Sequence, residues 1–238
     1  MYKYFFKRFF DVVFALLLLI PLMPIMLIVA LVIKLDSKGP AIFKQIRSGK
    51  NNKEFMLYKF RSMTCNNDFY DKSKEDQVTK VGKFIRKTSL DELPQLFNIL
   101  KGEMSFIGPR PWVIDYAKYF NTHQMRRLEV LPGITGLAQS SGRNAINILD
   151  RINLDVEYVD NMNLFLDIKI IFKTIIGVLK KEGFSNTKSA IHDELKTLQM
   201  QDNNMYKEEF TKTNNIRKHK TNKKKTREED KVLIGSGA

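Results

Sequence analysis

The chain has 238 residues, enough for one compact domain with a buried core. Forty Lys and Arg against twenty-six Asp and Glu give a net charge of +14, which points to nucleic acid, an anionic membrane surface or a phosphorylated substrate as partner. Cys65 is the one cysteine, which excludes an intrachain disulfide, and three scattered histidines disfavour a histidine-ligated zinc or iron site.

The first feature along the chain is an uncharged run from Val12 to Ile33. About 20 apolar residues suffice to span a bilayer, so this run predicts a membrane segment. A cleaved signal peptide has a shorter apolar region and a small-residue cleavage site, and neither is visible here. The segment therefore anchors the protein.

The flanks and the prolines of this segment bear on its topology. Positive residues stand on both sides, which places both flanks in the cytoplasm by the positive-inside rule. Pro21 and Pro24 each remove a backbone donor, so the helix should kink there. A bent, re-entrant helix satisfies both facts, but many proline-containing membrane helices still span, and both topologies stay open at this point.

The next segment, Ala41 to Met63, alternates apolar and polar residues on either side of a turn at 48–52, which predicts a β-hairpin. A polar loop should follow at 66–77, then helical spacing from Val81 to Leu100. A Gly/Pro-rich stretch at 102–111 breaks that spacing, and Tyr116 to Leu128 has a helical pattern again.

The run from Leu164 to Lys181 is heavily apolar with lysines interspersed, so it predicts a helix that packs in a core or lies in the membrane interface. Beyond about Leu198 the chain is polar and rich in Lys and Asn, and we expect a disordered tail that can rest on anionic lipid. The expected organisation is a membrane helix at 1–36, a catalytic domain at 37–185 and a basic tail at 186–238. The fold class is α+β, mainly helical.

The residues best suited to chemistry lie in the sequence RKTSLDELP, which ends at Pro94. Pro94 is tolerated in the first turn of a helix, so a helix should begin near Ser89 to Asp91. One interpretation is a capping box between Ser89 and Glu92, which is purely structural. The other is functional: a carboxylate at a helix N-terminus faces the place where phosphate binds, can attack phosphorus, and has a neighbour able to hold magnesium.

Attack on an anionic diphosphate also requires cations near the carboxylate. Predicted turns and strand ends supply five candidates: Lys59, Arg61, Arg86, Arg110 and Arg143. Each arginine taken alone is more often a solvated surface residue.

Four ordered stretches carry a specific resemblance: GPAIFKQIRSGKNNKEFMLYKFRSM, then IRKTSLDELPQLFNILKGEMSFIGPRP, then LPGITGLAQSSGRN, then LDVEYV with LDIKI. Over roughly Phe5 to Gly183 the chain resembles the small monotopic phosphoglycosyl transferases, a bacterial sugar transferase family. The resemblance implies transfer of a sugar phosphate from a UDP-sugar to undecaprenyl phosphate, at the cytoplasmic face of the bacterial inner membrane.

The resemblance also implies roles for single residues. Asp91 would be the nucleophile on the β-phosphate, with UMP as the first product, and Glu92, together with Asp91, would hold Mg²⁺, for which Mn²⁺ can substitute. The substrate-binding residues would be Arg86, Arg110, Arg143, Asp155 and Asp167, beside Lys59 and Arg61 from the residue argument.

In this family the membrane helix is re-entrant, with amphipathic helices at the interface, and is kinked at a Ser-Pro pair. Here Pro24 matches but Met23 stands where serine is usual, and Pro21 compensates. With one hydrophobic segment the chain is expected to be a minimal member of the family. GRNAI, beginning at Gly142, resembles the subset that acts on N-acetylated amino-deoxy sugars, while UDP-linked N-acetylglucosamine, galactose and glucose stay open.

Two other function classes would account for the anchor and the charge. A basic nucleic-acid or membrane-binding scaffold explains both, but it does not explain the Asp-Glu pair followed by the PRP, PGITG and GRN motifs. An inactive family member kept as an anchor is the third interpretation, although both dyad residues are present. We expect no nucleic-acid partner, and salt-sensitive DNA or RNA binding would indicate the scaffold.

Overall fold

A computed structural model of the chain describes residues 2–65, 77–142, 146–180 and 196–200. The chain divides into two units, Met1–Leu195 and Lys196–Ala238, and of the second unit the described residues 196–200 are helical. The first unit holds the predicted catalytic region, and the fold described below is that of this unit. The tail expected to be disordered lies almost entirely outside the described residues.

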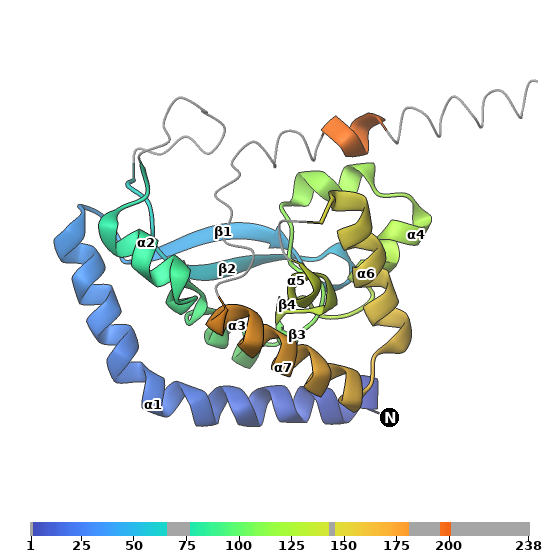
Figure 1. Cartoon of the computed structure of the whole chain (residues 1–238), viewed down its shortest axis with the longest axis horizontal. Coiled ribbons are helices and arrows are strands. Elements are labelled where there is room, and N and C mark those ends of the chain that lie inside the picture. Colours follow the sequence, from blue (N-terminus) through green and yellow to red (C-terminus); the bar gives the residue numbers. More distant parts are fainter. Residues whose placement is uncertain (1, 66–76, 143–145, 181–195, 201–238) are drawn as a thin grey trace, which may run out of the picture. The chain divides into compact units, whose positions relative to one another are not determined.

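The first unit is mainly helical with two small sheets (Figure 1). Its helices are α1 (Lys7–Asp36), α2 (Lys80–Lys87), α3 (Gln95–Lys101), α4 (Thr122–Met125), α5 (Leu137–Ser141), α6 (Ile148–Asn161) and α7 (Leu164–Leu179). Its strands are β1 (Ile42–Ser48), β2 (Glu54–Phe60), β3 (Ser105–Ile107) and β4 (Gly133–Thr135). The α+β prediction is confirmed in this coarse form.

The predicted hairpin is confirmed, because β1 and β2 pair antiparallel from Ile42 opposite Phe60 to Ser48 opposite Glu54. The connection is a short 3-10 turn at Lys50–Asn52, with Asn51 and Asn52 at positive φ. Asparagine is one of the few residues that enter this region at low cost, which explains why the chain reverses here.

The second sheet was not predicted from the sequence. β3 and β4 pair in parallel, with Ser105 opposite Gly133 and Ile107 opposite Thr135. Both strands lie in stretches that the sequence analysis assigned to breaks and turns. Gly133 is required there because a Cβ on it would come within 2.1 Å of the Gly108 nitrogen.

The predicted helix from Tyr116 to Leu128 is wrong in detail. The chain forms a 3-10 turn at Ile114–Tyr119, the short α4, and a second 3-10 turn at Arg126–Leu128. Asn121 begins α4 with a capping box in which its side chain and that of Gln124 bond each other's backbone amides. A capping residue has extended backbone geometry, so Asn121 ends any helix that approaches it from Tyr116.

Helix α1 is long and apolar enough to cross a membrane by its length and composition, as the sequence predicted. Pro21 and Pro24 lie inside it, and Figure 1 shows α1 bending part-way along its length. The bend brings both halves of α1 onto the rest of the unit through two separate apolar clusters.

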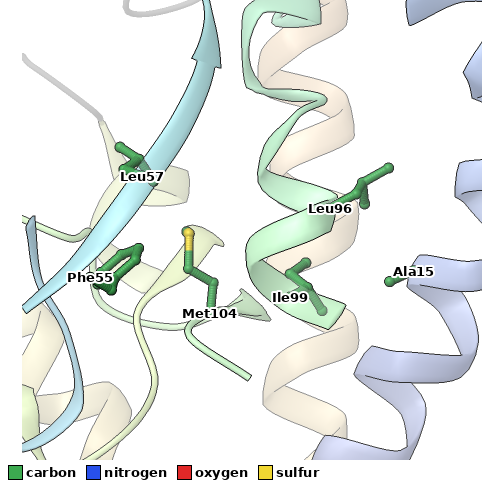
Figure 2. Packing of buried hydrophobic residues seen from close by; sticks show 6 residues of the cluster. All are labelled: Ala15, Phe55, Leu57, Leu96, Ile99 and Met104. Atoms are coloured by element: carbon green, nitrogen blue, oxygen red, sulfur yellow. The ribbon is translucent and has the colours of Figure 1, made fainter. Parts of the chain in front are cut away.

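The first cluster holds the half of α1 before the prolines. Ala15 of α1 belongs to one cluster with Leu96 and Ile99 of α3, Phe55 and Leu57 of β2, and Met104, and α3 lies between α1 and β2 (Figure 2). These side chains are almost fully buried. Their burial fixes α3 between the hairpin and α1.

The second cluster holds the half of α1 after the prolines. Met26, Val29 and Ile33 pack against Phe60 of β2 and Ile85 of α2. A third cluster joins β3 to α6 and α7 through Ile107, Val130, Tyr158, Val159 and Ile170. Leu90 and Leu93, on either side of Asp91 and Glu92, pack against the second cluster and so fix the connection between α2 and α3.

Candidate active site

Asp91 and Glu92 lie on a 3-10 turn, Leu90–Glu92, between α2 and α3. Ser89 precedes it at φ +58°, in the left-handed region, and its side chain makes no capping hydrogen bond. The capping-box interpretation of Ser89 and Glu92 is therefore wrong, because the Glu92 amide bonds the Ser89 carbonyl and α3 begins only at Gln95, after Pro94. The turn leaves the Glu92 carboxylate without the structural task that the capping box would have given it.

Three cations from separate elements surround this turn. Lys59, next to last in β2, places its Nζ 2.6 Å from the Glu92 Oε1. Arg110 Nη1 lies 4.0 Å from the same oxygen, and the Arg110 side chain is 48% exposed. Arg86 comes from α2 and its charge acts on Asp91. The structure thus brings together five of the residues predicted from the sequence.

Burial raises the pKa of the Asp91 carboxyl above its ordinary value, and the neighbouring Glu92 carboxylate adds to that effect. Lys59, Arg86 and Arg110 act in the opposite direction by favouring the ionised form. Asp91 is therefore a carboxylate held out of water against nearby positive charge. This is the environment in which a carboxylate is a better nucleophile than in bulk solvent.

Arg86 is held by its Nε, which donates to the Ser62 Oγ at 2.7 Å. Burial lowers the pKa of its guanidinium, and Asp91 opposes that shift.

Arg61 is the residue before Ser62, but its side chain contacts a different part of the fold. Its buried guanidinium donates to the carbonyls of Ile33, Ser37 and Lys38, at the C-terminal end of α1. The prediction that Arg61 binds substrate gains no support from this position.

Asp155 and Asp167, also predicted to bind substrate, are buried in ion pairs with other parts of the fold. Asp155 pairs with Arg127 at 2.7 Å, and both side chains are at most 2% exposed. Asp167 pairs with Lys7 of α1 at 2.7 Å and also accepts a hydrogen bond from Tyr158 at 2.8 Å. Both aspartates are therefore held by partners outside the dyad. Arg143 and Asn144 of the GRN motif lie outside the described residues.

Asn98 is a site residue that the sequence analysis missed. Its fully buried amide accepts from the Tyr58 backbone N–H at 3.1 Å and donates to the Met56 carbonyl at 2.7 Å and to Glu103 at 2.6 Å. It thereby joins α3, which follows the dyad, to β2, which carries Lys59. A polar residue between Leu96 and Ile99, at a buried position of the helical pattern, was the signal that could have found it.

Among the residues that the structure describes, no group of three or more His, Cys, Asp or Glu could hold a metal ion. The dyad supplies two carboxylates. Mg²⁺ is usually held by one or two carboxylates, with substrate phosphates and water completing the shell, so the donor set of Asp91 and Glu92 fits this ion. It does not fit zinc, which prefers Cys and His ligands.

The match to known proteins follows the same region. The family model for bacterial sugar transferases matches residues 2–181. The chain belongs to the bacterial sugar transferase family. This match covers the whole of the hairpin, the dyad turn and α7.

Several relatives have names that state an activity. The chain is 48% identical over 183 residues to the uncharacterized sugar transferase EpsL of Bacillus subtilis (76% of this chain, 91% of the relative). It is 44% identical over 192 residues to the UDP-glucose:undecaprenyl-phosphate glucose-1-phosphate transferase of Klebsiella pneumoniae (75% and 41%). It is 43% identical over 189 residues to the UDP-N-acetylgalactosamine-undecaprenyl-phosphate N-acetylgalactosaminephosphotransferase of Aeromonas hydrophila (75% and 45%). The chain therefore spans most of EpsL but less than half of the other two.

Proposed function

We propose that this chain transfers a sugar phosphate from a UDP-sugar to undecaprenyl phosphate, with Asp91 as a covalent nucleophile. The observation that carries the proposal is the partly buried Asp91 carboxylate, whose ionised form is favoured by the positive charges of Lys59, Arg86 and Arg110. Family membership and the activities named for the Klebsiella and Aeromonas relatives give the reaction class. The activity in turn makes the chain a membrane enzyme of bacterial glycan or capsule assembly.

In the first step an Asp91 carboxylate oxygen attacks the β-phosphorus of the UDP-sugar. The bond from that phosphorus to the oxygen bridging the two phosphates breaks, and UMP leaves with the electron pair. The sugar phosphate is then an acyl phosphate on Asp91. The cations around the dyad stabilise the negative charge that develops on the leaving UMP.

In the second step a phosphate oxygen of undecaprenyl phosphate attacks the same phosphorus. The acyl phosphate bond breaks, Asp91 returns to its carboxylate form, and the product is an undecaprenyl diphosphate sugar. A phosphate oxygen is already ionised near neutral pH, so neither step requires a general base. Glu92 is less suited to attack, because Lys59 holds its carboxylate at 2.6 Å.

A Mg²⁺ ion, or Mn²⁺ in its place, would be held by Glu92 and Asp91 and would neutralise charge on the diphosphate. Lys59 and Arg110 act on the same Glu92 oxygen, and so set where its carboxylate lies. The arginines bind the anionic substrate from the other elements of the site.

We also propose that α1 enters one leaflet and returns, so that the catalytic unit stays on the cytoplasmic face of the inner membrane. Both halves of α1 pack on the same unit, through Ala15 before the prolines and through Met26, Val29 and Ile33 after them. Its two ends are held as well, by the bond from Lys7 to Asp167 and by Arg61 at the last carbonyls. A straight span would separate these contacts.

The apolar face of α7 supports the same placement at the membrane. Phe165, Phe172 and Leu179 are 83%, 63% and 75% exposed, and the exposed lysines Lys169 and Lys173 lie between them. An amphipathic helix of this kind lies in the headgroup region, where its apolar side chains enter the acyl layer and its lysines meet lipid phosphates. We therefore propose that α7 is interfacial.

The sugar is proposed as an N-acetylated amino-deoxy sugar, on the resemblance of GRNAI to that subset. The relatives' names include glucose, galactose and N-acetylgalactosamine. UMP release measured against a panel of UDP-sugars with undecaprenyl phosphate identifies the substrate.

The nucleophile is tested by Asp91→Asn, because an amide cannot form the acyl phosphate. We expect UMP release to fall to background, while Asp115→Asn, an exposed aspartate paired with Lys118, leaves it unchanged. Mass spectrometry of the unaltered protein, incubated with UDP-sugar and no acceptor lipid, should find the sugar phosphate on the peptide that contains Asp91. Substantial turnover by Asp91→Asn would contradict the assignment.

A further inference from the structure

The segment that carries Arg110, Pro109–Trp112, is held by its own main chain. Its four successive carbonyls accept hydrogen bonds from three other parts of the fold. The pairs are Gly133 N to Pro109 O at 2.9 Å, Arg127 Nη2 to Arg110 O at 2.7 Å, Arg47 Nη1 to Pro111 O at 3.5 Å, and Ser48 N to Trp112 O at 3.0 Å. Prolines on both sides of Arg110 restrict its backbone further. The side chain of Arg110, by contrast, is 48% exposed.

The donor to the Arg110 carbonyl is itself tightly fixed. The Arg127 side chain is 1% exposed, and its Nε and Nη2 donate to the Asp155 Oδ2 at 3.1 and 2.7 Å. Its guanidinium carbon lies 4.3 Å from the centre of the Trp112 ring. One guanidinium thus contacts the carboxylate of α6, the ring of Trp112 and the main chain of Arg110.

Stability alone does not account for this arrangement. Desolvating two charges costs several kcal/mol per ion, and apolar residues of similar volume often replace a buried ion pair without loss of stability. A planar fork of donors holds Asp155 and the Arg110 carbonyl at once in a fixed geometry. Apolar side chains donate to neither, and a lysine ammonium is a compact charge on a flexible stem that does not fix this geometry. The negative charge of Asp155 also attracts the positive charge of Arg110.

We infer that Arg127, held in place by Asp155, is a positioning residue that sets where Arg110 meets the diphosphate of the UDP-sugar. This inference rests on the proposed function, in which Arg110 binds the diphosphate beside Glu92. Arg127 fixes the point from which the Arg110 side chain extends, so that a largely exposed side chain reaches the dyad from a rigid base. Asp155 then serves the substrate through Arg127 and Arg110, rather than by contact.

The test compares two variants of the ion pair. Arg127→Lys keeps a charge opposite Asp155 but loses the fork that reaches the Arg110 carbonyl. The double variant Arg127→Met with Asp155→Leu removes both charges and keeps the volume. We expect Arg127→Lys to lower kcat/KM for the UDP-sugar by roughly 10- to 100-fold, the size of effect that misplacing a catalytic group produces. We expect the double variant to unfold at or above the wild-type temperature and still to show this loss.

A double-mutant cycle with Arg110→Ala separates positioning from a general structural effect. If Arg127 acts through Arg110, Arg127→Lys should cost less than about threefold once Arg110 is alanine, because coupled residues are not additive. The emission of Trp112, which is the single tryptophan of the chain, reports independently of activity that the ring has lost its guanidinium neighbour. We expect it to shift in Arg127→Lys and not in Arg110→Ala.

Two results would overturn the inference while leaving the proposed function intact. One is activity that returns together with thermal stability in the double variant, and the other is a full loss from Arg127→Lys in the Arg110→Ala background. Wild-type kinetics in Arg110→Ala itself would instead contradict the role proposed for Arg110, and the inference with it. An Asp91→Asn protein that still turns over would count against the proposed function alone.

Discussion

Replacing Asn98 by leucine should destabilise the protein strongly, although the two side chains have similar volumes. The fully buried Asn98 amide satisfies the Tyr58 N–H and the Met56 carbonyl, which lie on β2, one of two strands in its sheet. Each main-chain group left unpaired costs about 1–3 kcal/mol, and burying a leucine offsets part of that. We therefore expect a loss of roughly 2–5 kcal/mol in the free energy of unfolding.

For a domain of this size that loss lowers the unfolding temperature by roughly 5–15 °C, which circular dichroism of the protein in detergent can measure. The matched control is Asn153→Leu at an exposed position of α6, where we expect a change within about 0.5 kcal/mol. An Asn98→Leu protein that unfolds within 2 or so degrees of the wild type would refute the reasoning, since a cost of about 1 kcal/mol already exceeds that shift.

A second pair of variants tests the bond from Asn98 to Glu103 specifically. Asn98→Asp keeps an acceptor for Tyr58 but loses the donors and sets a carboxylate against that of Glu103, at a position where the two groups lie 2.6 Å apart. Glu103→Gln in the same chain restores a donor and removes the repulsion. Asn98→Asp should therefore be the least stable variant, and adding Glu103→Gln should recover part of the loss. If adding Glu103→Gln recovers none of the lost stability, the contact between residues 98 and 103 does not contribute to the stability of the protein.

The other predictions concern catalysis and topology. Because burial raises the pKa of the Asp91 carboxyl, activity that needs the carboxylate should decline as the pH falls through that raised pKa. Lys59→Met removes a cation that opposes the shift, so it should move this decline to higher pH. A pH profile of kcat/KM that moves to lower pH in Lys59→Met would contradict the assignment. Chelation with EDTA should abolish UMP release and added Mg²⁺ or Mn²⁺ should restore it, so full activity after rigorous chelation would rule out the metal. Replacing Pro21 and Pro24 with alanine should straighten α1 and move its N-terminus to the periplasm, as read from labelling of Lys3→Cys, in an otherwise cysteine-free chain, by an impermeant thiol reagent on intact cells. Labelling with both prolines intact would favour a spanning anchor.

Several parts of the protein could be predicted from residues that are neighbours in the sequence. The hairpin was predicted because alternation and turn residues act over a few positions, and the structure confirms it as an antiparallel pair. The apolar run of α1 and the presence of its prolines were equally local. The dyad was found in the same way, as two adjacent carboxylates before a proline.

Other features depend on residues that are far apart in the chain. Lys59 meets Glu92 across 33 positions, and Asp167 meets Lys7 across 160. The sequence contains the charges but no signal of which pairs form, so it did not predict that Asp155 pairs with Arg127 or that Asp167 pairs with Lys7. The parallel pairing of β3 with β4 was missed for the same reason, since two three-residue strands have no periodicity of their own.

What the sequence by itself determined is therefore the set of elements with strong local patterns, the family, and the adjacent carboxylates to which we assign the reaction. Only the tertiary structure decided which cations face Asp91, that Ser89 forms a left-handed turn in place of a capping box, and that both halves of α1 pack on one unit. The physical reason is that propensity, capping and amphipathic periodicity act within a few residues, whereas the burial of a charge depends on what the rest of the chain brings to it.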